Sequence, residues 1–117
     1  MIPEGDEQVA LEVERRGQAA LLHIRGSVGF AEADELREQL SRLADEKCDP
    51  IVLNLEGMYF IASAGLGALV EAHLKARHHQ GQIRLLNPRP TVRRLFETTR
   101  LTKLFPVFED DRTALGE

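Results

Sequence analysis

The stretch IVLNLEGMYFIASAGLG, residues 51–67, decides the fold of this chain. It begins with a short apolar run at 51–55, bounded by turn signals, which is typical of a strand buried on both faces of a parallel sheet. A long helical pattern follows at about 66–79. The stretch therefore predicts a strand that leads through a short loop into a helix, with Ser63 at the junction.

Ser63 lies where a serine can cap a helix, because its side-chain oxygen can accept a hydrogen bond from one of the first free N–H groups. The same place suits a phosphate, since the start of a helix presents N–H donors and the positive end of the helix dipole. Capping alone would explain a serine at this position. These residues are compatible with both a structural role and a regulatory role for Ser63.

Strand and helix patterns alternate on both sides of this stretch. Two strand-like segments joined by the turn at 16–18 predict an antiparallel hairpin. The alternation that follows predicts a largely parallel sheet with right-handed crossovers. We expect an α/β fold in the order β-β-α-β-α-β-α, with helices packed against a mostly parallel sheet of about four to five strands. The expected strands are 9–14, 19–25, 51–55 and 82–87, with an edge segment at 106–109, and the expected helices are 30–43, 66–79 and 91–99.

Apolar residues three or four positions apart predict which helix faces point into the core. In the first helix these residues are Phe30, Ala33, Leu36, Leu40 and Leu43. In the second helix the inward stripe and its margin are Leu66, Leu69, Val70, His73, Leu74 and Arg77. Glu32 belongs to the charged face that we expect to meet solvent. Thr91 is a possible cap of the third helix, and Gly81 suits the position after the second.

The composition is that of an ordinary globular protein, with 117 residues of which 43% are apolar and 29% charged. We expect one domain over residues 1–117, with residues 1–6 loose and residues 111–117 loose or briefly helical. The net charge of −4 argues against broad nucleic-acid binding. The chain has no apolar run of about 18 residues and no apolar signal segment. We expect a cytoplasmic protein that does not insert into membranes, as a monomer or weak dimer.

Residues with metal-binding or redox chemistry stand in contexts that favour plain structural roles. Cys48 is the single cysteine and lies in a loop-like stretch, so we interpret it as a bystander thiol. His23 lies among apolar strand residues with no second ligand near it in sequence. His78 and His79 are adjacent and would point to different sides of a helix, which makes them a poor chelating pair. We expect no metal and no other cofactor.

The enzyme motifs that the chain approaches fail on spacing. Ser63 resembles the serine of a G-x-S-x-G nucleophile elbow, but Ile61 occupies the first glycine position. Val70 stands where a dinucleotide loop needs its third glycine, and the chain has no G-K-[ST] phosphate loop. We therefore expect a binding protein without catalytic residues, and keep a small serine hydrolase as a minor hypothesis.

Two stretches together resemble the STAS domain of bacterial anti-sigma-factor antagonists. Residues 51–67 are similar to the family's buried strand and switch loop, which usually reads D-L-S-x-V-x-F-I-D-S-S-G-L-G. Residues 90–101, PTVRRLFETTRL, are similar to its x-V-x-R-L-F-E-x-x-G-L ending, with Arg100 where glycine is common. The resemblance covers 51–108 and, more loosely, the whole chain, and it implies a STAS fold.

The resemblance also implies a function and a site. In that family the first serine of D-S-S-G is phosphorylated by a partner anti-sigma factor that is a serine kinase. The unphosphorylated antagonist binds that kinase and frees the sigma factor, and a phosphatase resets the cycle. The matching residue is Ser63, and ATP would belong to the kinase. The implied partner-binding residues are Ala62, Ser63, Ala64, Gly65, Leu66 and Gly67, with Ser27 and Gly29 from the neighbouring loop.

The chain departs from the family pattern close to Ser63. Ala62 replaces the family's aspartate, Ala64 replaces its second serine, and the segment 26–29 reads GSVG where the family often has G-E-L-D. Two acidic groups expected near the serine are thus absent from those positions. An alternative is a STAS interaction module, of a scaffold or transporter-associated kind, that binds its partner without being phosphorylated.

Overall fold

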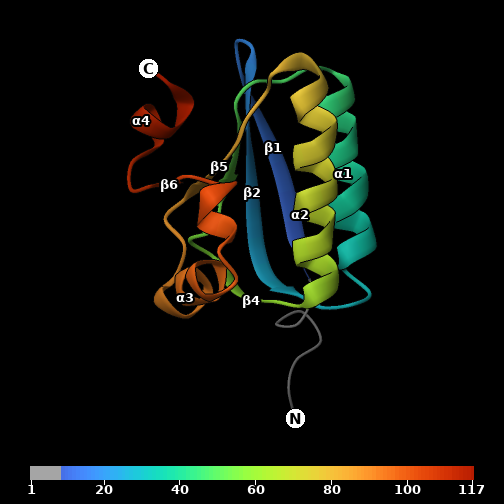
Figure 1. Ribbon diagram of the computed structural model, residues 1–117, viewed down its shortest axis with the longest axis vertical. Coiled ribbons are helices and arrows are strands. Elements are labelled where there is room, and N and C mark those ends of the chain that lie inside the picture. The colour runs from blue at the N-terminus through green and yellow to red at the C-terminus, as the bar shows by residue number, and fades with distance from the viewer. Residues whose placement is uncertain (1–8) are drawn as a thin grey trace.

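The computed structural model describes residues 9–117, which form a mixed sheet with its longest helices on one face (Figure 1). The expected loose segment at 1–6 lies outside the described residues. The strands are β1 (Ala10–Arg16), β2 (Ala19–Val28), β3 (Ile51–Asn54), β4 (Met58–Ile61), β5 (Ile83–Leu86) and β6 (Val107–Phe108). The helices are α1 (Ala33–Asp45), α2 (Ser63–Ala76), α3 (Pro90–Thr98) and α4 (Asp111–Leu115), with the short 3-10 turns η2 (Arg77–His79) and η3 (Leu101–Lys103).

The sheet confirms the expected α/β fold. Its strand order is β1-β2-β3-β5-β6, with β1 and β2 antiparallel and the remaining pairs parallel. The predicted hairpin is therefore present. The sheet has six strands rather than four or five, because the segment Met58–Ile61 forms β4, a strand that the sequence patterns did not reveal.

β2 is longer than the sequence predicts, and it pairs with both β3 and β4 in addition to β1. It continues through Gly26 to Val28, where the prediction ended it at Gly26. Its first half pairs with β3, and its last residues pair with β4, with a register shift between Gly26 and Ser27. Gly26 has φ 94, a left-handed conformation that glycine adopts easily, so the strand can change direction there without strain.

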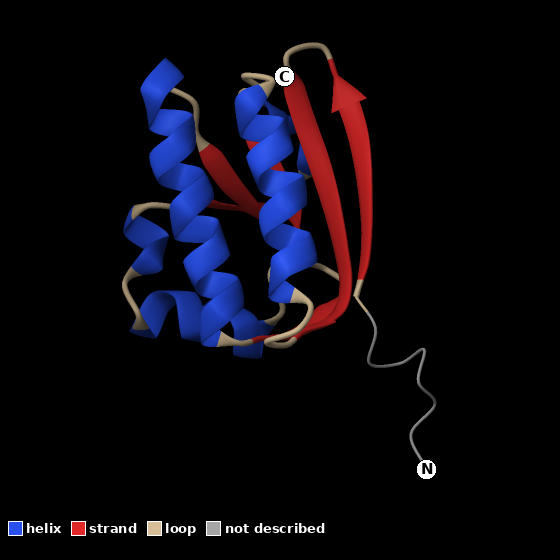
Figure 2. Ribbon diagram, turned by 90° about the vertical axis from the view of Figure 1, so that its right-hand side faces the viewer, coloured by secondary structure: helices blue, strands red, loops and turns tan. Residues whose placement is uncertain are grey.

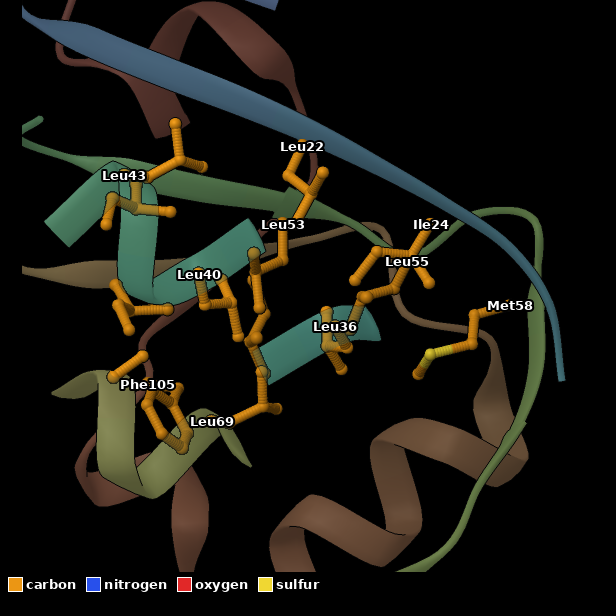
Figure 3. Close-up of a cluster of buried hydrophobic side chains, with 14 of the residues drawn as sticks. Leu22, Ile24, Leu36, Leu40, Leu43, Leu53, Leu55, Met58, Leu69 and Phe105 are labelled. Carbon is orange, nitrogen blue, oxygen red and sulfur yellow. The ribbon is translucent and has the colours of Figure 1, made fainter. Parts of the chain in front are cut away.

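The core fills the space between the sheet and the two long helices. Figure 2 shows α1 and α2 lying side by side across one face of the sheet. Figure 3 shows the side chains that meet there, among them Leu22, Leu40 and Leu53, which are fully buried. On the opposite face Val52 packs in a second cluster with Ala114 and Leu115 of α4. β3 is therefore buried on both faces, as its apolar run predicted. The tail at 111–117, expected to be loose or briefly helical, is helical over Asp111–Leu115.

Three of the residues predicted to form the inward stripes or their margin lie at the surface: Phe30, Leu74 and Arg77. Phe30 precedes α1 in a turn and its side chain is 83% exposed. Leu74 is 54% exposed, because α2 turns its small residues toward the core instead. The buried residues of α2 are Gly65, Ala68, Leu69, Ala72 and Ala76. Small side chains let neighbouring elements approach the helix axis closely, which accounts for a buried face so poor in large residues.

Three expectations about helix ends are wrong. Ala62 and Arg89, both extended, hold the N-cap positions of α2 and α3, and neither helix has a side-chain cap. Ser63 is thus the first helical residue rather than a cap, and Thr91 lies inside α3. After η2 the left-handed residue is Gln80, not Gly81. None of the helices within residues 9–117 is long and apolar enough to cross a membrane.

The structure places Cys48 in the core and His23 on the face of a strand. Cys48 is 4% exposed, and burial raises the pKa of its thiol. His23 lies on a strand face, where its Nε2 is 3.3 Å from Glu14 and its Nδ1 is 2.9 Å from Asn54. No cluster of three or more His, Cys, Asp or Glu side chains within the described chain could hold a metal ion.

Candidate functional site

Ser63 lies where β2 and β4 end together beside the start of α2. The two strands are parallel, with Ser27 opposite Phe60 and Val28 opposite Ile61. The Ala62 N–H extends this pairing by donating to the Val28 carbonyl oxygen over 2.8 Å. The loop after β2 and the first turn of α2 therefore lie side by side at one end of the molecule (Figure 1). The structure brings together the two segments that the sequence placed at one site.

Ser63 is exposed at this edge, and the backbone around it is open to an anion. The N–H groups of Gly65 and Leu66 both donate to the Ala62 carbonyl oxygen, over 2.9 and 3.1 Å. The two N–H groups before them, at Ser63 and Ala64, precede any acceptor that the helix itself can supply. Those donors and the positive end of the helix dipole favour negative charge at Ser63.

Gly65 and Gly67 contribute differently to this turn. A Cβ atom at Gly65 would lie 2.6 Å from Cγ1 of Ile61 and 3.0 Å from Cγ1 of Val28, so only glycine lets α2 start this close to β2 and β4. A Cβ atom at Gly67 would meet nothing within 4 Å. Close packing therefore explains why residue 65 is a glycine. The glycine at position 67 leaves open space on the exposed side of α2.

Three large aromatic side chains are exposed in the segments that adjoin Ser63. Phe60, which precedes it in β4, is 53% exposed, and Phe30 in the neighbouring loop is 83% exposed. Tyr59 is 58% exposed, and the Arg89 guanidinium lies 4.2 Å from the centre of its ring. Sequence reasoning missed all three aromatic residues, since it assigned Phe30 to the core and left 58–60 without a strand. Exposed aromatic residues are enriched in protein-binding surfaces.

The loop beside Ser63 contains one carboxylate, that of Glu32. The sequence had assigned this residue to the charged face that meets solvent. Oε1 of Glu32 accepts a hydrogen bond from the Gly29 N–H over 2.9 Å, so this side chain turns back toward the loop rather than outward to solvent. A Cβ atom at Gly29 would lie 2.6 Å from that oxygen. The carboxylate thus occupies the space that a side chain at position 29 would need.

The site lacks the surroundings of a nucleophilic serine. Within residues 9–117 no side-chain hydrogen bond involves Ser63, so no His or carboxylate is positioned as its base. His23 is engaged by Glu14 and Asn54 instead. What the arrangement offers chemically is an accessible hydroxyl group on an apolar surface, next to free N–H donors.

The fold and this site together define a small regulatory binding domain. The family model of the STAS domain matches residues 10–114, and the chain belongs to that family. Two relatives extend over most of its length. The anti-sigma F factor antagonist of Paenibacillus polymyxa is 25% identical over 108 residues, which is 92% of each chain. BtrV of Bordetella bronchiseptica, named as an anti-sigma factor antagonist, is 32% identical over 84 residues, which is 72% of each chain.

A solved structure supports the same fold. The anti-sigma factor antagonist SpoIIAA in its unphosphorylated form superposes with a TM-score of 0.78 at 21% identity, over 90% of this chain and 93% of that one. The family model confirms the resemblance seen in the sequence, and this structure confirms the α/β architecture. The roles of individual residues around Ser63 remain predictions.

Proposed function

We propose that this protein is an anti-sigma-factor antagonist that binds a serine-kinase anti-sigma factor while Ser63 is unphosphorylated. Binding frees the sigma factor in the cytoplasm, phosphorylation of Ser63 by that kinase ends binding, and a phosphatase restores it. The observation that carries the proposal is the exposed Ser63 hydroxyl group at the first turn of α2, among the exposed side chains of Phe30 and Phe60. The names of the relatives from Paenibacillus polymyxa and Bordetella bronchiseptica support the same reading.

The docking surface in this proposal combines the first turn of α2 with the loop after β2. Its members are Ala62, Ser63, Ala64, Gly65, Leu66 and Gly67, with Ser27 and Gly29. Ala62 and Ala64 carry small side chains, so a partner can reach the Ser63 hydroxyl group from either side. Gly67 leaves open space on the same helix, where a partner element can approach the backbone closely. The chain itself needs no cofactor for this role, because the kinase supplies the ATP site.

Phosphorylation would act on docking rather than on folding. A phosphate adds roughly −1.5 to −2 charges and three acceptor oxygens. The free N–H groups and the dipole of α2 can accommodate that charge in the unbound protein. In a complex the same charge would be desolvated against an apolar partner, at a cost of several kcal/mol. A hundredfold loss of affinity needs only about 2.7 kcal/mol.

The test uses the purified protein, its cognate kinase-type anti-sigma factor and ATP. We expect a mass increase of about 80 Da that maps to the peptide containing Ser63. Ser63→Ala should abolish it, whereas Ser41→Ala, which changes a serine on α1 outside the docking surface, should retain it. Ser63→Asp should weaken the complex at least tenfold and Ser63→Ala should not. A mass increase that survives Ser63→Ala would refute the assignment of Ser63.

A second candidate is a STAS interaction module that binds without phosphorylation. Ala62 and Ala64 favour it, because they stand where the family pattern has an aspartate and a second serine. This candidate predicts a partner complex whose affinity is the same with and without ATP. The two proposals therefore differ in one measurement, the dissociation constant of the complex before and after incubation with ATP.

A further inference from the structure

An open cavity lies toward the other end of α2, away from Ser63. Its volume is about 610 Å³, and its lining comes from the last turns of α2, η2, the start of β5 and η3. The lining residues that matter here are His73, Arg77, Arg84, Lys103 and Asp49. Because a helix rises about 1.5 Å per residue, the cavity lies roughly 15–20 Å from Ser63. The docking surface proposed above does not include it.

Two of the cations in this cavity have no charge partner. Arg77 and Lys103 are exposed and form no ion pair with any other residue of the described chain. Arg84 is engaged, because its Nη1 donates to the Ala114 carbonyl oxygen over 2.8 Å and its Nε donates to Gln82 over 2.7 Å. The single acid of the lining, Asp49, accepts the Gln82 N–H over 3.0 Å. The cavity therefore carries an excess of positive charge.

His73 also lines this cavity, and its ring carries an unsatisfied polar atom. Its Nδ1 is buried and has no hydrogen-bond partner within residues 9–117. The ring stands edge-on to Phe105, with 5.8 Å between the ring centres. Burial and then the charge of Arg77 lower the pKa of His73, so the imidazole is neutral at neutral pH and carries one N–H donor. Buried polar atoms without a partner are uncommon in folded proteins.

The sequence shows the same concentration of charge. Residues 72–108 contain eight Lys and Arg residues but only one acidic residue, Glu97, although the whole chain has a net charge of −4. The end of α2 does not cancel this charge, because the carbonyl oxygens of Ala76 and Arg77 already accept the N–H groups of Gly81 and Gln80. A cavity whose cations outnumber its single acid attracts anions.

We propose that this cavity binds a small phosphate-bearing anion. Arg77 and Lys103 supply the charge, and the His73 imidazole donates a hydrogen bond. Charge-assisted hydrogen bonds to phosphate are among the strongest polar contacts that side chains make, which suits a site open to water. The inference goes beyond the function proposed for Ser63 and does not depend on it, since no residue is shared between the two sites.

The test is an NMR titration of the full chain with inorganic phosphate and with pyrophosphate, at constant pH and ionic strength. We expect saturable shifts of the His73 imidazole signals and of the amide signals of Arg77 and Lys103. The double variant Arg77→Gln/Lys103→Gln should bind at least tenfold more weakly, equivalent to about 1.4 kcal/mol. Saturation by inorganic phosphate would identify a single phosphate group as sufficient, and saturation by pyrophosphate alone would identify two linked groups.

The matched control is Arg93→Gln/Arg94→Gln, which removes the same charge from exposed positions on α3 that do not line the cavity. This control should bind within about twofold of the unchanged chain, because salt largely screens the effect of distant, exposed charges. An equal loss of affinity in both double variants would overturn the proposal, because binding would then follow net charge. Shifts that never saturate with either anion would overturn it as well.

Discussion

The two glycines of the α2 start provide a matched pair for a stability measurement. Replacing glycine by alanine inside a helix stabilises it by about 1 kcal/mol, through the lower backbone entropy of the unfolded chain. At Gly67 nothing opposes this gain, because a Cβ atom there meets nothing within 4 Å. We expect Gly67→Ala to raise the free energy of unfolding by about 1 kcal/mol.

At Gly65 the same substitution would place the added methyl group against buried side chains of the core. The added Cβ atom would lie 2.6 Å from Cγ1 of Ile61, whose side chain is only 3% exposed and has little room to move. Overpacking of this kind costs about 1–3 kcal/mol. After the helix gain is subtracted, Gly65→Ala should lower the free energy of unfolding by about 0–2 kcal/mol. The difference between the two variants isolates the overpacking cost, because the entropy gain is common to both.

The assay is urea unfolding of both variants and the unchanged chain, followed by circular dichroism with a shared slope of free energy against urea. The midpoints should fall in the order Gly65→Ala, unchanged chain, Gly67→Ala. Equal midpoints for the two variants would refute the close packing of α2 on β2 and β4. The affinity for the anti-sigma factor provides a second measurement that separates stability from binding. If Gly67 lets a partner approach the helix closely, the more stable variant, Gly67→Ala, should bind the anti-sigma factor more weakly.

Three further predictions concern single side chains. Phe30→Ser should leave the unfolding midpoint nearly unchanged, because the ring is 83% exposed, but should weaken the partner complex about tenfold, as expected for an aromatic anchor; equal affinity would argue against its role. Cys48 should react with iodoacetamide far more slowly in the folded than in the urea-unfolded protein, because burial raises its thiol pKa, and equal rates would contradict its buried position. Asp110 caps α4 through Thr113, and these hydrogen bonds lower its pKa in the folded state. The stability that it adds is therefore present above the pKa of the unfolded chain and lost as pH falls through the lower folded value. Asp110→Ala should destabilise the protein at pH 7 and not at pH 2, as measured by urea midpoints.

The position of Ser63 could be predicted because its determinants are local. An apolar run, a short polar break and a glycine-containing helical pattern follow one another within residues 51–67, and each is recognisable without its tertiary neighbours. The resemblance to the STAS family added the phosphoacceptor hypothesis to a position already marked as a helix start. The predicted capping role of Ser63 was wrong, because the backbone at Ala62 is extended and Ser63 is the first residue of the helix.

The exposed aromatic surface could not be predicted from the same evidence. Phe30 has the spacing of an inward residue with respect to Ala33, but α1 begins only at Ala33, after Glu32 has turned back to the Gly29 N–H. The helical period therefore does not extend to Phe30. Phe60 was missed because β4 buries its first and last residues and exposes the two between, a pattern that lacks the alternation of an ordinary half-buried strand.

The amino-acid sequence by itself determined the order of most strands and helices, the antiparallel hairpin, the doubly buried β3 and the placement of Ser63 at the start of α2. These features depend on periodicities and turn residues within short segments. Tertiary structure alone decided that β2 extends to Val28, that β4 pairs with it, and that Phe30, Phe60 and Ser63 share one edge. The physical reason is that these features rest on hydrogen bonds and packing between segments far apart in the chain, such as the contact between Val28 and Ala62.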